Sequence, residues 1–250
     1  FYGCTALKEI DIPECVSRIS STAFQGSGIT HITLPRSMTE VPAKIFGGCE
    51  SLESVKLCEG ITTIGDHAFV GCEKIKSIDI PESIMSVGAY AFSGCIGLEE
   101  IKLPDGVTKI GIGAFSGCSS LKRFKIPSGI TEIPERGFKD CTGIESIEIP
   151  NTVTKISPYA FSGCDGVKSL VVPDSVTEIG YGAFADCIRL ESVTISSNIT
   201  KIPDKLFSGC IRLKTVVIPE NVTTIGNSVF ADCDALTEII IPEGVTTIGS

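Results

Sequence analysis

The chain has few of the residues on which catalytic and metal sites depend. Its 250 residues include no Trp, two Met and two His, which are His31 and His67. We expect both His side chains to be solvated, the first at an outward strand position and the second in a surface turn. Neither accompanies a nucleophile motif such as G-x-S-x-G, and phosphate-binding and dinucleotide-binding glycine motifs are absent too. The sequence therefore predicts no enzyme, no metal site and no cofactor.

Charge and hydrophobic patterning argue against two further classes of protein, those that bind nucleic acid and those that span a membrane. The formal net charge is −9, whereas binding to nucleic acid phosphates needs a basic footprint. No apolar run approaches the ~20 residues of a membrane span, so we expect no membrane insertion within this segment. Both ends fall inside a repeat without an atypical capping unit, from which we expect a segment of a longer protein.

One phrase recurs along the whole chain, Ala-Phe-x-Gly-Cys-x-x-Leu-x-x-Ile-x-Ile-Pro-x-x-Val-Thr-x-Ile-Gly, with a period of 23 residues and a single step of 22. Such a period is typical of stacked units that bury a continuous core which no unit could form alone. We therefore predict one solenoid domain over residues 1–250, built from eleven units. The marker residues are Phe1, Phe24, Phe46, Phe69, Phe92, Phe115, Phe138, Phe161, Phe184, Phe207 and Phe230.

Each unit is expected to contain two short strands and a turn. In the fifth unit, residues 101–103 alternate in polarity, which is the period of a strand with one buried face. Pro104 ends the pairing because it has no N–H to donate, and residues 107–110 predict a second strand. Residues 113–115 predict a single helical or 3-10 turn, closed by a left-handed Gly117 or by Asp at that position in other units.

The twelve Cys predict buried thiols rather than a disulfide framework. Ten of them follow the marker Phe by three residues, and no C-x-x-C pair exists. In a stack of identical coils these side chains point the same way rather than at each other, so we expect no disulfide. Cys15 and Cys58 lie outside this column and two units apart, so a bond between them is not expected either.

The phrases Ala91–Cys95, Ile126–Ile133 and Gly26–Thr30 resemble the BspA-like class of leucine-rich repeats. The resemblance covers the whole chain, and the third phrase is similar to a shortened unit, which accounts for the step of 22. It implies a leucine-rich-repeat-type curved coil with a parallel β-sheet on the concave face and helical or 3-10 turns on the other side. It also implies a non-catalytic surface or secreted protein that adheres to host cell-surface or matrix proteins.

A partner is expected to meet the outward side chains of the first strand. The first outward column alternates in sign from Glu53 to Lys214, and because opposite charges on neighbouring strands stabilise a sheet, we assign this column to structure. Partner preference then falls mainly to the two other outward columns, where apolar and basic side chains gather. The candidate ligand-binding residues are Val171, Val217, Ile240, Lys102, Lys122, Arg123 and Lys125.

Several alternatives stay open. A structural spacer or stalk with no ligand of its own would show the same repeat, and a solvated sheet face without a partner fits the outward columns as well. A column of Thr within the second apolar pair, at the position of Thr108, is expected to donate its hydroxyls to neighbouring backbone carbonyls. The tripeptides that begin at Asn198 and Asn221 fit the glycan-acceptor pattern, which matters if the source is eukaryotic.

Overall fold

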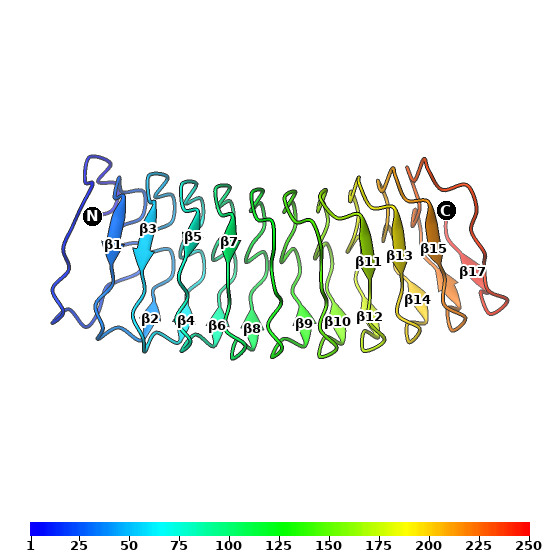
Figure 1. The fold of residues 1–250 in the computed structure, drawn as a ribbon, viewed down its shortest axis with the longest axis horizontal. Coiled ribbons are helices and arrows are strands. Elements are labelled where there is room, and N and C mark those ends of the chain that lie inside the picture. The colour runs from blue at the N-terminus through cyan, green and yellow to red at the C-terminus, as the bar shows by residue number, and fades with distance from the viewer.

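The computed structural model describes residues 1–250 and shows one elongated coil, with the N-terminus at one end and the C-terminus at the other (Figure 1). We number the coils 1 to 11 by the marker Phe that begins each, so that coil 6 begins at Phe115 and coil 8 at Phe161. The regular elements are all strands of two or three residues. The structure has no helix that is long and apolar enough to cross a bilayer.

The first strands of successive coils form one row, which we call the first-strand row. Their pairing is parallel and in register, so that a residue faces its equivalent one repeat later, as His31 faces Ser54. The row contains three sheets, β1-β3, β5-β7 and β11-β13-β15. Its members are β1 (His31–Thr33), β3 (Ser54–Lys56), β5 (Ser77–Ile78), β7 (Glu100–Ile101), β11 (Ser169–Val171), β13 (Ser192–Thr194) and β15 (Thr215–Val217).

A second row of strands follows the proline turn of each coil and is also parallel. Its sheets are β2-β4-β6-β8, β9-β10-β12 and β14-β16-β17. The predicted solenoid of short parallel strands is confirmed by these two rows. The members are β2 (Glu40–Val41), β4 (Thr63–Ile64), β6 (Ser86–Val87), β8 (Lys109–Ile110), β9 (Glu132–Ile133), β10 (Lys155–Ile156), β12 (Glu178–Ile179), β14 (Lys201–Ile202), β16 (Thr224–Ile225) and β17 (Thr247–Ile248).

The expected helical or 3-10 turn before the marker Phe is absent, and the hydrogen bonds show why. Ala68 N, Val70 N and Cys72 N donate to carbonyls three residues earlier. The amides between them, at His67, Phe69 and Gly71, donate instead to the next coil. A 3-10 helix needs consecutive local bonds, so the alternation gives a run of single turns that also joins the coils.

Left-handed backbone occurs at two positions of this turn. The predicted one, two residues after the marker Phe, is confirmed at Gly117 (φ 75°) and at Asp140 (φ 59°). The other, two residues before the marker Phe, was not predicted, because in most coils it holds a side chain such as His67 (φ 56°) or Tyr159 (φ 55°), and only two coils have Gly there. Non-Gly residues adopt this region uncommonly, and here the next-coil hydrogen bonds hold them in it.

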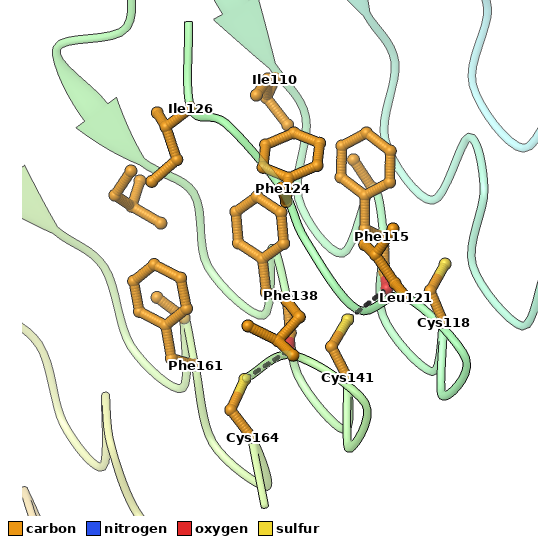
Figure 2. Close-up of a cluster of buried hydrophobic side chains, with 14 of the residues drawn as sticks. Ile110, Phe115, Cys118, Leu121, Phe124, Ile126, Phe138, Cys141, Phe161 and Cys164 are labelled. Atoms are coloured by element: carbon orange, nitrogen blue, oxygen red, sulfur yellow. Dashed lines mark hydrogen bonds between the residues drawn. The ribbon is translucent and has the colours of Figure 1, made fainter. Parts of the chain in front are cut away.

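The marker Phe side chains form the centre of the core. Neighbouring rings stack along the coil with centroids 5.1–6.1 Å apart, as between Phe69 and Phe92 (5.1 Å). Beside this spine runs the cysteine column, whose thiols are free and, from Cys49 onward, buried. The Sγ of Cys141 donates to the carbonyl oxygen of Phe115 at 3.0 Å, and Cys164 repeats the bond one coil later (Figure 2). Each thiol therefore points at the preceding coil's backbone and not at another sulfur.

Phe124 is the one Phe outside the spine, and the first-strand row is irregular where it lies. Its ring occupies a position held by Ile or Val in most coils and tilts against Phe115 (4.9 Å) and Phe138 (4.7 Å) (Figure 2). Only an isolated bridge, Glu100 to Arg123, extends the sheet beyond β7, and the next strand of the first-strand row is β11. Coil 6 thus carries a second buried Phe, and neither coil 6 nor coil 7 has a regular first strand.

The threonine column behaves as predicted. Thr154 Oγ1 donates to the carbonyl oxygen of Thr131 at 3.3 Å, and the same bond recurs in other coils. The acceptor-pattern residues Asn198 and Asn221 also bond between coils, through Nδ2 to the carbonyl oxygens of Asp174 (2.7 Å) and Ser197 (2.9 Å). Both amide nitrogens therefore take part in the stacking of the coils.

Candidate protein-binding face

The outward side chains of the first-strand row make a continuous surface, which we call the first-strand face. It consists of the residues seven, eight and ten positions after the marker Phe, such as Lys168, Ser169 and Val171 in coil 8, and of those one position earlier in the shortened coil 2. Strand alternation puts these side chains outside and the intervening one in the core, so that β11 shows an exposed, buried, exposed pattern. Because outward positions are not fixed by core packing, they are free to encode a partner.

The alternating charge column forms fewer ion pairs than its sequence suggests. Lys214 Nζ lies 2.7 Å from Glu191 Oε2, and this hydrogen bond lowers the pKa of Glu191 below its ordinary value. No other neighbours in the column come within ion-pair distance between Glu53 and Lys214. The alternation therefore avoids adjacent like charges, while most of these charges stay available to solvent or to a partner.

The basic spot, Lys102, Lys122, Arg123 and Lys125, lies on coils 5 and 6 and is exposed. Lys125 Nζ is 3.1 Å from Oδ1 of Asp105, in the proline turn of the preceding coil. Sequence reasoning did not include Asp105, because this residue lies outside the outward columns. The other three cations form no ion pair, so the spot keeps a positive balance.

The apolar strip, Val171, Val217 and Ile240, lies on coils 8, 10 and 11 with Thr194 between its first two members. The three side chains are 63%, 69% and 76% exposed, respectively. A shallow hollow of about 460 Å³ lies between coils 10 and 11 and includes Val217 and Ile240 in its wall. The structure therefore brings the three predicted apolar residues onto one part of the face.

A second hollow, of about 600 Å³, lies at the N-terminal end of the same face. His31 Nδ1 is 2.8 Å from Ser54 Oγ within it, and both side chains are exposed. Glu9, the neighbour of His31 on the other side, makes no ion pair with the ring. The arrangement is therefore an ordered pair of polar side chains rather than a Ser-His-acid triad.

Sequence reasoning missed an aromatic ridge on the turn side of the coil. Tyr90 stacks on His67 at 5.2 Å, so this His is not simply solvated. Tyr159 meets Tyr181 edge-on at 5.2 Å, and the guanidinium of Arg136 lies 5.6 Å from the Tyr159 ring. The signal was present in the sequence, because these aromatic residues fall two or three positions before a marker Phe.

The second-strand row also carries an alternation of charge that was not predicted. Lys155 lies 3.6 Å from Glu132 and 3.5 Å from Glu178, and these two carboxylates raise its pKa above the ordinary value. A groove of about 810 Å³ runs beside it over coils 3 to 7, lined mostly by polar residues and Gly. Of its charged residues, Glu132, Glu135 and Lys155 form ion pairs within the chain, whereas Asp66 and Lys109 form none.

Short parallel strands, inward columns of Leu and Ile and a polar outward sheet define a leucine-rich-repeat-type solenoid. The chain belongs to the BspA type leucine rich repeat family, whose profile matches six copies over residues 1–97, 85–183 and 131–250. The resemblance read from the sequence is thereby confirmed.

Solved structures agree with this assignment. A leucine-rich repeat protein from Bacteroides ovatus superposes with a TM-score of 0.60 at 27% identity, over 93% of this chain and 78% of that one. The T. pallidum leucine rich repeat protein gives a TM-score of 0.51 at 28% identity, over 88% and 82%. The pneumococcal vaccine antigen PcpA shares the fold with a TM-score of 0.53 at 19% identity, over 92% and 65%. A comparison with curated proteins found no significant match.

Proposed function

We propose that this chain is a non-catalytic protein-interaction module of a cell-surface or secreted protein. It adheres to host cell-surface or extracellular matrix proteins through the first-strand face, where the apolar strip and the basic spot contact the partner. Membership of the leucine-rich repeat family supports the interaction role, since these solenoids present extended surfaces for binding.

The observation that carries the proposal is the exposure of the apolar strip. Within coils 2 to 10, no other large apolar side chain is as exposed as Val217 and Val171, at 69% and 63%. The fold does not require Val at this position, because equivalent outward residues include Lys56 and Asp79. An exposed apolar group beside small polar ones is the composition of a protein contact.

Three variants test the proposal in a binding titration against a panel of immobilised matrix proteins. Arg123→Glu with Lys125→Glu reverses the basic spot, and Val217→Glu puts a charge into the apolar strip. Lys74→Glu, at an exposed turn position away from the face, is the matched control for an added negative charge. We expect the first two variants to lower affinity at least about tenfold, because a misplaced interfacial charge is strongly unfavourable. The control should bind like the unaltered chain.

Thermal melts accompany each titration, and all variants should melt within about 2 °C of the unaltered chain because they change only surface positions. If the face variants bind as well as Lys74→Glu, the first-strand face is not the binding surface. If the unaltered chain binds no protein in the panel or on host cells, the structural spacer is the better description.

A further inference from the structure

The alternating column gives the first-strand face a symmetry property that a random mixture of charges would lack. Consider a second copy turned about a two-fold axis that lies parallel to the strands and passes between two coils. Each coil then faces a coil of opposite parity, so wherever two coils of the alternating stretch face each other a Glu meets a Lys. An axis through the middle of a coil instead sets each charge against its own kind. The face is therefore self-complementary in the way an isologous interface requires.

We propose that the apolar strip is covered by a second copy of this chain, with the two-fold axis between coils 9 and 10. The proposal rests on the proposed function, because both take the first-strand face as a protein-binding surface. It adds a second copy of the chain as a weak, exchanging occupant of the C-terminal part of that face, where the copy and a matrix protein compete for the apolar strip.

The position of the two-fold axis sets which coil of one copy faces which coil of the other, and we call this alignment the register of the dimer. Charge complementarity is the first argument for the register with the axis between coils 9 and 10. Glu191 of coil 9 faces the partner's Lys214, and Lys214 of coil 10 faces the partner's Glu191. Within each copy these two side chains are already hydrogen-bonded at 2.7 Å. The dimer therefore closes four charges of alternating sign into one network, which is worth more than an isolated exposed pair.

Apolar matching is the second argument. In the same register Val171 of coil 8 faces the partner's Ile240, and Thr194 of coil 9 faces the partner's Val217. Each of the three apolar side chains, which are 63–76% exposed in the single chain, thus meets an apolar side chain or the methyl group of Thr. The remaining outward column sets Ser192 against the partner's Thr215, so no like charges meet within the overlap.

Neighbouring registers lose these matches. An axis between coils 8 and 9 would set Glu148 against the partner's Val217 and Lys125 against the partner's Ile240. An axis through coil 9 would set Glu191 against the partner's Glu191. Only the register between coils 9 and 10 pairs opposite charges and also covers all three apolar side chains with uncharged groups.

The overlap is short, and this sets the strength of the association. Four coils at about 4.8 Å each span roughly 15 Å between the first and the last strand. A patch of this length buries less area than a standard interface. We therefore expect a weak, rapidly exchanging dimer. Coils 1 to 7 of the two copies extend in opposite directions from the overlap, which leaves the basic spot uncovered for another partner.

Sedimentation velocity of the whole chain, at concentrations from about 10 µM to about 1 mM, tests the proposal with a charge-swap pair. Glu191→Lys alone and Lys214→Glu alone each set like charges against each other in the dimer, so each should raise the dissociation constant at least about tenfold. An equimolar mixture of the two variants restores both opposite-charge contacts, so it should regain the association. Circular dichroism should show both variants folded, since each replaces one outward side chain that is not part of the core.

A chain that stays monomeric at about 1 mM, a dimer that neither variant weakens, or a mixture that does not recover would each overturn the proposal. The variant Arg123→Glu with Lys125→Glu separates it from the proposed function, because these residues lie outside the overlap. That variant should dimerise normally while it loses matrix binding. A monomeric chain that still binds matrix proteins refutes the dimer alone, and a dimer that binds none refutes the adhesion function alone.

Discussion

Phe115→Ala is the sharpest test of the aromatic spine. Phe115 is fully buried, and its ring stacks on Phe92 and on Phe138, both at 5.5 Å. It also meets Phe124 at 4.9 Å. A buried Phe→Ala change costs about 3–5 kcal/mol, and each lost aromatic pair adds about 0.5–1.5 kcal/mol beyond area, which places this site at the upper end of that range. For a chain of this size the melting temperature should fall by roughly 10–20 °C.

The assay is a thermal melt followed by circular dichroism, with Phe1→Ala as the matched control. Phe1 belongs to the same column but is 60% exposed and stacks only on Phe24, at 5.3 Å. The control should therefore melt within about 2 °C of the unaltered chain. The reasoning is refuted if Phe115→Ala lowers the melting temperature no more than Phe1→Ala does.

Two further predictions concern the thiols and the glycine turns. Burial raises the pKa of Cys95 and of Cys141 to about 12 from an ordinary 9.0. Below pH 9 both thiols are neutral in the folded and in the unfolded chain, so the stability that comes from burying them is fully present there. This stability is lost as the pH rises from about 9 to 12, because the thiols ionise first in the unfolded chain. Urea midpoints across that range measure the loss, and a midpoint that rises instead would contradict the burial argument. Gly111→Ala should destabilise by about 1–3 kcal/mol in a urea melt, because a Cβ there would lie 2.5 Å from the backbone carbon of Gly88. Gly106→Ala, where a Cβ meets nothing within 4 Å, should stay within about 0.5 kcal/mol, and equal losses at both sites would show that close coil approach is not what Gly111 provides.

The repeat made the scaffold predictable, because each inward position recurs at one phase of the period. Period-two alternation and the proline after it were enough to place both strand rows and to separate core from surface. The turn was predicted wrongly as helical, since its alternate amides donate to the next coil and this choice is not visible in one unit. Phe124 was visible in the sequence as an exception, but the missing regular first strands of coils 6 and 7, in the region where it lies, were not predicted.

The candidate site was predictable in part. Outward columns placed Val171, Val217 and Ile240 on one face, because strand alternation fixes which way a side chain points. Partners outside those columns could not be found in that way, and Asp105 beside Lys125 is the example. The single contact of Lys214 with Glu191 likewise depends on side-chain conformations that a charge pattern does not specify.

Hydrogen exchange of the chain in complex with a captured matrix protein can locate the partner on the coil. We predict slowed exchange, relative to the free chain, in the first-strand segments 169–171, 192–194 and 215–217, with little change in the second-strand row. Slowed exchange confined to second-strand segments such as 109–110, 132–133 and 155–156 would contradict it and would place the partner on the opposite row of the coil.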